Sequence, residues 1–167
     1  NPVIIIGLSG GCDSVFLLRA LAPLHATKEL SLHAIYINHG WRESAVADED
    51  FCAALCARYG IPFHTEHVAR WPTKAAPHKI RSGSKEADAR EIRRLILEAE
   101  RERLHADAIA LAHHAEDQIE TFFIRLIRGG GLSGLCGMKE RSGAIIRPLL
   151  LKSKTEILSW LNAHHQP

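Results

Sequence analysis

The stretch VIIIGLSGGCDSVFLL, residues 3–18, decides the fold of this 167-residue chain. Val3–Leu8 is an apolar, β-branched run of the length of a strand, and a helical pattern follows from Asp13 to Leu24. Ser9–Ser14 turns the chain between them with two adjacent glycines. A wholly apolar strand that leads through a short turn into a helix is typical of parallel sheets, which helices cover on both faces.

The rest of the chain continues this alternation of strands and helices. Apolar runs predict further strands at Leu32–Ile37, Phe63–Val68 and Ala108–Ala112, and a weak strand at Ala144–Arg147. Periodic segments predict helices at Ala45–Tyr59, Ser84–Leu104 and Ala115–Arg128, and a last helix from Ser153, where Glu156 completes a capping box. This order predicts an α/β fold with an open parallel, Rossmann-like sheet and helices on both faces.

The helix predicted at Ala115–Arg128 carries an apolar stripe that we expect to face the core. The stripe consists of Ile119, Phe122, Phe123, Leu126 and Ile127. Asp117 and Glu120 lie three residues apart and therefore share another face of this helix. The residues alone allow two interpretations of these acids, a solvated polar stripe or a site for a substrate ammonium group.

The composition is ordinary for a soluble globular protein, and we expect no transmembrane helix. Hydrophobic residues make up 46% and charged residues 24%, and no run of about 18 apolar residues predicts a transmembrane helix. We expect one domain over residues 1–167. The four cysteines lack CxxC spacing, which favours reduced thiols over disulfides or a structural metal. Ala69–Gly83, with proline, glycine and basic residues, predicts a mobile surface loop.

The glycine-rich turn Ser9–Ser14 has the composition of a phosphate-binding loop. In an open α/β sheet, ligands bind beyond the carboxyl ends of the strands, where this turn lies. Gly10 and Gly11 let the backbone approach an anion, the N–H groups at the helix start attract it, and the two serines add hydroxyl donors. Asp13 would repel phosphate but could hold a bridging Mg²⁺. The alternative is a plain strand-to-helix turn in which Ser or Asp caps the helix.

Three further patterns bear on nucleotide and phosphate binding. The turn is not a Walker A loop, because that motif needs a lysine that is absent here. Gly129–Gly134 matches GxGxxG, but it follows a helix instead of a strand and therefore does not predict a dinucleotide site. Residues 124–154 carry seven Lys and Arg against one Glu, a patch that either attracts phosphate groups or is ordinary solvated surface.

The hexapeptide SGGCDS at 9–14 resembles the SGGxDS signature of the PP-loop, or N-type, ATP pyrophosphatases. Enzymes of this class cleave ATP to AMP and pyrophosphate and so activate a substrate as an adenylate. Other stretches are similar to motifs of one family in this class, the tRNA isoleucine lysidine synthetases. YINHGWR at 36–42 resembles their NHxLR element, with Trp41 in place of leucine, and KEADAREIR at 85–93 resembles their EAxARxxRY helix, with Arg94 in place of tyrosine.

The second half of the chain continues the resemblance. HHAEDQIET at 113–121 resembles HHxDDQxET, with Glu116 in place of the first aspartate. RGGGLSGLCGM at 128–138 and RPLL at 147–150 complete the set in the family's order and spacing. The resemblance therefore extends over nearly the whole chain.

The resemblance implies an ATP-dependent ligase that acts on the wobble cytidine of an isoleucine tRNA with a CAU anticodon. ATP adenylates carbon 2 of this cytidine through its oxygen, with release of pyrophosphate, and the amine of free L-lysine then displaces AMP to leave lysidine. The resemblance also implies an adenine nucleotide α-hydrolase type of sheet, Mg²⁺ with the ATP, and a cytoplasmic protein that does not bind membranes, and it leaves room for a homodimer. The family's C-terminal tRNA-recognition domains are expected to be absent from this chain.

The resemblance and the position at the sheet edge together assign the candidate site residues. ATP is expected to bind Ser9, Gly10, Gly11, Cys12, Asp13, Ser14, His39 and Arg42. Catalysis is expected from Asp13, Arg93, Asp117 and Glu120, with Asp13 as the Mg²⁺ ligand and with Asp117 and Glu120 also binding lysine. Contacts with tRNA or phosphate are expected from Arg90, His114, Arg128 and Arg147. For His39 and Arg90, an ordinary structural histidine and a solvated helix face are equally consistent with the residues alone.

Two other functions are compatible with parts of this pattern. One is another PP-loop enzyme that modifies tRNA, such as a thiolase, although those that resemble it usually need CxxC cysteines, which this chain lacks. The other is a non-catalytic ATP-binding domain with a similar sheet, which would have no need of Asp117 and Glu120 beside a basic tract. Release of pyrophosphate in the presence of lysine and tRNA separates the three.

Overall fold

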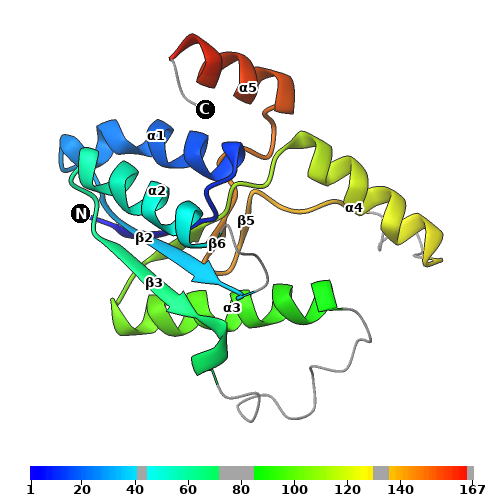
Figure 1. Cartoon of the computed structure of the whole chain (residues 1–167). Coiled ribbons are helices and arrows are strands. Elements are labelled where there is room, and N and C mark those ends of the chain that lie inside the picture. Colours follow the sequence, from blue (N-terminus) through cyan, green and yellow to red (C-terminus); the bar gives the residue numbers. More distant parts are fainter. Residues whose placement is uncertain (41–44, 72–84, 130–135, 165–167) are drawn as a thin grey trace.

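The computed structural model describes residues 1–40, 45–71, 85–129 and 136–164. Within these residues, a six-stranded sheet in the order β3-β2-β1-β4-β6-β5 forms the centre, with helices on both faces (Figure 1). Neighbouring strands pair in parallel, except that β5 is antiparallel to β6 at the edge. No described helix is long and apolar enough to cross a membrane.

The strands and helices alternate along the chain, with the following bounds. The strands are β1 Val3–Leu8, β2 Ser31–Asn38, β3 Phe63–His67, β4 Ala108–Ala110, β5 Arg141–Ser142 and β6 Ile145–Ile146. The helices are α1 Cys12–Ala26, α2 Ala45–Arg58, α3 Lys85–Arg103, α4 Ala115–Ile127 and α5 Lys154–Ala163, with a short 3₁₀ helix at Val68–Arg70.

The strand β1 is apolar throughout because both of its faces are covered. Successive side chains of a strand point to opposite faces. Ile6 and Leu8 lie in the core cluster beneath α1, α2 and α5. Ile5 lies on the other face, where it packs with Leu97 of α3 and with Ile109 of β4. The continuous apolar run at the start of the sequence is thus the pattern of a central parallel strand.

The predicted fold class and order of elements are confirmed. β1 has the predicted bounds, and α2 and α4 end within one residue of the predicted positions, before Gly60 and Gly129. Both glycines have positive φ angles, +65° and +74°, which glycine adopts without strain at the end of a helix. Among the differences from the prediction, α1 ends at Ala26 instead of Leu24, and β4 ends at Ala110 instead of Ala112. The two-residue strand β5 is too short to leave a sequence pattern.

The prediction that the apolar stripe of α4 faces the core is wrong. No residue of α4 is buried, and the exposed fraction reaches 56% for Ile119 and 83% for Ile127. Figure 1 shows α4 projecting from the body of the domain instead of lying on the sheet. A period of 3.6 residues identifies an amphipathic helix, but it does not reveal whether the apolar stripe meets the domain's own core.

The capping box at the start of α5 is present as predicted, and its loss is expected to destabilise the fold. Ser153 Oγ accepts a hydrogen bond from the backbone N–H of Glu156 at 3.2 Å, and Glu156 accepts one from the backbone N–H of Ser153 at 2.8 Å. Ser153→Ala should lower the free energy of unfolding by about 1 kcal/mol, measured by urea denaturation. Ser159→Ala, the same change at an exposed interior position of α5, is the control and should change stability much less.

The same box predicts how stability depends on pH. Hydrogen bonds from the backbone and then the side chain of Ser153, followed by one from Lys152, lower the pKa of Glu156 to about 2. A carboxyl whose pKa is lower in the folded than in the unfolded chain stabilises the fold above the unfolded pKa, and this contribution disappears as the pH falls through the folded value. The stability difference between wild type and Ser153→Ala should therefore narrow as the pH falls from about 4.5 toward 2. An unchanged difference over that range would show that the box contributes little.

Candidate functional site

The turn after β1 presents the start of α1 at the carboxyl edge of the sheet. Gly10 has a φ of +78°, a left-handed conformation that favours glycine. Gly11 is the N-cap of α1 and has no side chain to cap it, so the N–H groups of the first turn stay available to a ligand. The hydroxyl of Ser14 braces the loop, since it accepts from the Ser9 N–H at 3.2 Å and donates to the Gly11 carbonyl at 2.9 Å. This arrangement suits an anion such as phosphate.

The start of α4 lies beside this loop because β1 and β4 are parallel neighbours in the sheet. His114, the residue before α4, has 12% of its side chain exposed. Its Nε2 atom lies 3.8 Å from a carboxylate oxygen of Asp13 and 3.6 Å from one of Asp117. Two acids predicted from different motifs therefore converge on a single ring nitrogen.

Glu116 orients the ring of His114. The hydrogen bond from the backbone N–H of Lys154 is the main cause that lowers the pKa of Glu116, so its carboxylate is ionised at neutral pH and only accepts hydrogen bonds. Nδ1 of His114, at 3.0 Å from that carboxylate, must then be the donor. The other ring nitrogen, Nε2, faces Asp13 and Asp117.

A lysine from the other end of the sequence completes this group. Lys154 Nζ lies 2.6 and 2.7 Å from the two carboxylate oxygens of Asp13 and 3.0 Å from Cys12 Sγ. Burial alone would lower the pKa of Lys154, but its hydrogen bonds with Asp13 and Cys12 outweigh burial and raise it. Lys154 therefore carries a positive charge directly at the first turn of α1.

A second group of residues at the same edge is basic. Arg147, which follows β6, donates from Nε to Nδ1 of His113 at 3.2 Å. Burial and then the charge of Arg147 lower the pKa of His113, Asp117 partly opposes them, and Arg90 and Arg93 lower it further. These charges and burial keep the imidazole of His113 neutral at pH 7. The guanidinium groups around it are donors that can bind phosphate.

His39 extends this basic group toward β2, which it follows in the sequence. Burial and then the charge of Arg93 lower the pKa of His39. Electrostatic interactions thus link residues from three different parts of the chain. Arg93 affects the pKa of His39, and the charges of Arg90, Arg93 and Arg147 affect the pKa of His113. The basic group and the acidic group around His114 both stand at the carboxyl edge of the sheet.

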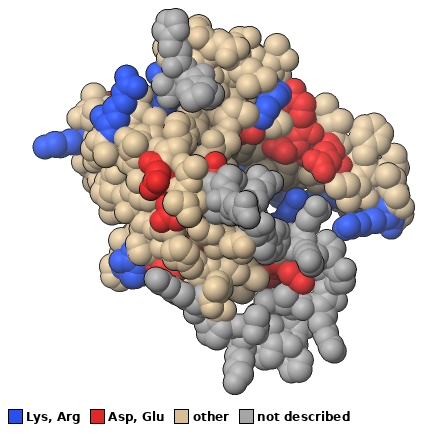
Figure 2. All heavy atoms as spheres, viewed as in Figure 1, with Lys and Arg blue, Asp and Glu red and all other residues tan. Residues whose placement is uncertain are grey.

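Other predicted site residues lie further from this centre. Glu120 is exposed on α4, one turn beyond Asp117, and Arg128 is exposed at the far end of that helix. Figure 2 shows acidic side chains gathered over the start of α4 and basic ones at its far end. Arg42 and the glycine-rich residues 130–135 lie outside the described residues.

The carboxylates of Asp13 and Asp117 fit a divalent cation. Mg²⁺ is bound in proteins by one or two carboxylates together with phosphate oxygens of the substrate. Asp13 contacts the positively charged ammonium group of Lys154. Asp13 and Asp117 both approach Nε2 of His114. Of the two, Asp13 belongs to the glycine-rich turn after β1 and could hold a divalent cation there.

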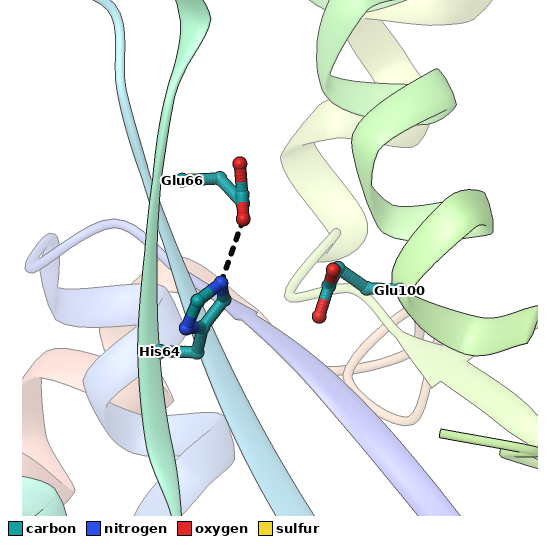
Figure 3. A group of neighbouring side chains, drawn as sticks. All are labelled: His64, Glu66 and Glu100. Atoms are coloured by element: carbon teal, nitrogen blue, oxygen red, sulfur yellow. Dashed lines mark hydrogen bonds and ion pairs between the residues drawn. The ribbon is translucent and has the colours of Figure 1, made fainter. Parts of the chain in front are cut away.

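Another polar cluster, between β3 and α3, is satisfied without a ligand (Figure 3). His64, Glu66 and Glu100 offer potential metal-ligand atoms within 4.8 Å of one another. Glu66, however, accepts hydrogen bonds from His64 at 2.6 Å and from Trp71 at 2.8 Å. Glu100 is buried and accepts a hydrogen bond from Arg103 at 2.6 Å. Hydrogen bonding within the protein accounts for this cluster.

Sequence reasoning assigned no role to two residues that shape the site. Gln118 donates to the Met138 carbonyl at 2.7 Å and accepts from the Met138 N–H at 2.5 Å, which fixes the chain after the glycine-rich stretch beside α4. The sequence alone distinguishes Lys154 only as one of the basic residues of 124–154. The signal that could have singled it out is a phosphate loop without a lysine, combined with a lysine at the start of a later helix.

Comparison with known proteins agrees with this architecture. A family model described as "PP-loop domain" matches residues 1–167. The chain is 39% identical over 158 residues to the tRNA(Ile)-lysidine synthase of Parabacteroides distasonis and 40% identical over 159 residues to that of Bacteroides thetaiotaomicron. Each match covers 95% of this chain, but 34% and 35% of the respective relatives. The chain thus spans about a third of the length of the curated relatives it matches.

Solved structures confirm the type of sheet. The U34-tRNA thiolase NcsA from Methanococcus maripaludis has a TM-score of 0.77 and 23% identity, over 97% of this chain and 57% of that one. NMN synthetase from Francisella tularensis has a TM-score of 0.62 and 18% identity, over 98% of this chain and 62% of that one. At these identities the likeness concerns the fold.

Proposed function

The chain belongs to the PP-loop domain family, and we propose that it is the ATP-using domain of a ligase that joins free lysine to the wobble cytidine of an isoleucine tRNA. The family model supports the use of ATP, and the relatives named tRNA(Ile)-lysidine synthase support the tRNA. One observation carries the proposal. Asp13 of the phosphate loop and Asp117 of α4 approach the same nitrogen of His114, so an activated nucleotide and an amine would meet there. The reaction would take place in the cytoplasm.

ATP is proposed to bind with its phosphates on Ser9–Ser14. The N–H groups at the start of α1 and the hydroxyl of Ser9 supply hydrogen-bond donors to phosphate oxygens. Asp13 would hold Mg²⁺, which when bound neutralises negative charge on the phosphates. His39 and Arg42 are proposed to line the nucleotide site from the end of β2.

The first step is the adenylation of the cytidine. The oxygen on carbon 2 of the base attacks the α-phosphorus of ATP and forms a new P–O bond. The bond from the α-phosphorus to the oxygen that bridges it to the β-phosphorus breaks, and pyrophosphate leaves with that oxygen. Negative charge builds on the phosphates in the transition state, where the guanidinium of Arg93 is proposed to stabilise it. Arg90 and Arg147 are proposed to bind phosphate groups of the tRNA.

The second step joins lysine to the activated carbon. A nitrogen of lysine forms a bond to carbon 2, and the bond from carbon 2 to the oxygen of AMP breaks, so AMP leaves with that oxygen. An ammonium group must lose a proton before it can attack. Asp117 and Glu120 are proposed to bind this ammonium and to accept its proton, and Asp117 lies 3.6 Å from His114 Nε2.

The order of product release tests the proposed reaction. With the natural full-length protein, ATP and a CAU-anticodon isoleucine tRNA, pyrophosphate release should require tRNA, and AMP release should in addition require lysine. Pyrophosphate release that is independent of tRNA, or AMP release that is independent of lysine, would contradict the proposed reaction.

Mg·ATP is expected to protect Cys12 from alkylation, because phosphates bound to the loop would cover its sulfur. At an ATP concentration of about ten times Kd, iodoacetamide labelling of Cys12 should be about tenfold slower, measured by mass spectrometry of peptides. Cys136 is exposed and should label equally with and without ATP. Cys52 and Cys56 are buried, and burial raises the pKa of each to about 12, so both should stay unlabelled. Equal labelling of Cys12 in both conditions would place the phosphates elsewhere.

A further inference from the structure

The phosphate loop contains no cationic side chain of its own. Residues 7–14 include neither lysine nor arginine, and their one charged side chain is the carboxylate of Asp13. Phosphate groups that approach this loop are therefore repelled by Asp13 unless a cation stands beside it. The structure supplies such a cation from α5, because the ammonium of Lys154 contacts both carboxylate oxygens of Asp13.

The backbone of Lys154 is held at this place by independent contacts. Its N–H donates to both carboxylate oxygens of Glu116 at 3.0 Å, which ties the start of α5 to the start of α4. Further along the helix, Trp160 packs edge-on against Phe16 of α1, with 5.1 Å between the ring centroids. The base of the lysine is thus fixed relative to the loop, while 33% of its side chain is exposed and can approach a ligand.

One of the three N–H donors of the Lys154 ammonium can be transferred to a phosphate oxygen. An ammonium group has three N–H donors. Two of the contacts of Lys154 are to the carboxylate of Asp13, at 2.6 and 2.7 Å, and the third is to Cys12 Sγ at 3.0 Å. A thiol is a weak acceptor, and a phosphate oxygen is a much stronger one because it is charged. An arriving phosphate oxygen would replace the sulfur without breaking the ion pair with Asp13.

We propose that Lys154 binds the pyrophosphate end of ATP while it remains paired with Asp13, and so supplies from α5 the lysine that this phosphate loop lacks. This inference rests on the proposed function, which places the phosphates of ATP on Ser9–Ser14. It makes Lys154 a ligand of the substrate and not only a structural partner of Asp13.

Binding of inorganic pyrophosphate with Mg²⁺, measured by calorimetry, tests the inference on the unreacted protein. Lys154→Met should weaken this binding about tenfold or more, the scale of one charge-assisted hydrogen bond. Lys154→Arg, which keeps the charge, should retain most of it. Lys152→Met is the matched control, because Lys152 lies two residues earlier and pairs with Glu156 at 3.2 Å instead of with the loop. It should bind pyrophosphate as the wild type does.

The same measurement in an Asp13→Asn background separates a phosphate ligand from a structural partner. If Lys154 only neutralises Asp13, its removal should have no effect once Asp13 is neutral. If it contacts phosphate, Lys154→Met should still weaken binding in that background, by several-fold or more relative to Asp13→Asn alone. Thermal unfolding checks that the variants are folded, and Lys154→Gln replaces the methionine variant if that one is not.

The outcomes distinguish the inference from the function on which it rests. Failure of the wild-type chain to bind either pyrophosphate or ATP would contradict the proposed function itself. If the wild type binds pyrophosphate and Lys154→Met binds it with the same affinity, only the proposed role of Lys154 is contradicted. An effect that disappears in the Asp13→Asn background would also overturn that role and leave a structural ion pair.

Discussion

Asp13→Asn is expected to slow pyrophosphate release about a hundredfold or more, while the affinity for ATP changes far less. Loss of a group that stabilises charge in the transition state lowers the rate more than it weakens binding of the ground state. Asp13 is placed for this role at the first turn of α1, in contact with Lys154 and 3.8 Å from His114. Asparagine keeps the shape of the side chain and removes the charge that would hold Mg²⁺.

The measurement compares two assays on the same variant. Pyrophosphate release is followed with tRNA and saturating Mg·ATP, and ATP affinity is measured separately by calorimetry. Asp50→Asn, the same change at an exposed position of α2, should leave both unchanged. Normal pyrophosphate release by Asp13→Asn at ordinary Mg²⁺ concentrations would remove Asp13 from the mechanism.

The double variant Asp117→Asn, Glu120→Gln is expected to lose lysine incorporation by about tenfold or more, the scale of roughly 1.4 kcal/mol for one lost ionic contact. Asp117 lies in the first turn of α4, where the helix dipole favours negative charge, and Glu120 lies in the next turn. The amide of asparagine can still accept the hydrogen bond that Asp117 receives from the His114 N–H at 2.8 Å, so the start of the helix should persist. ATP binding should therefore be retained.

The single variants should show which of the two acids contributes more to lysine incorporation. Asp117 lies 3.6 Å from His114 Nε2, whereas Glu120 is exposed one turn further along, so Asp117→Asn should account for most of the loss. Incorporation of radiolabelled lysine into tRNA, measured as a function of lysine concentration, gives the effect of each. Glu102→Gln, at an exposed position of α3, is the control and should behave as the wild type. Ordinary lysine dependence of the double variant would mean that lysine binds elsewhere.

Much of the fold could be predicted because local signals agreed with its topology. The apolar run Val3–Leu8 marked the central strand, Gly60 and Gly129 marked helix ends, and Ser153 with Glu156 marked the start of α5. The parallel order of strands also implied that the turns after β1 and β4 share one edge of the sheet. That edge is where the structure places Asp13 beside His114.

What the sequence could not predict depends on tertiary contacts. The stripe of α4 looked like a core face because periodicity does not identify the surface that a helix packs against. The contact of Lys154 with Asp13 joins residues 141 positions apart, and it depends on where α5 packs on α1. No local pattern encodes such a contact. The charges of Arg93 and Arg147 reach His39 and His113 in the same way, through the assembled edge and not through neighbouring positions.

The most direct test of the account is the mass of a CAU-anticodon isoleucine tRNA after incubation with the natural full-length protein, Mg·ATP and lysine. Lysine joined to carbon 2 of the cytidine replaces an oxygen that leaves with AMP. The account therefore predicts a tRNA whose mass rises by one lysine minus one water, with the change confined to the wobble cytidine on fragmentation and absent when lysine is omitted. A tRNA of unchanged mass under conditions that consume ATP, or a modified cytidine that forms without lysine, would contradict it.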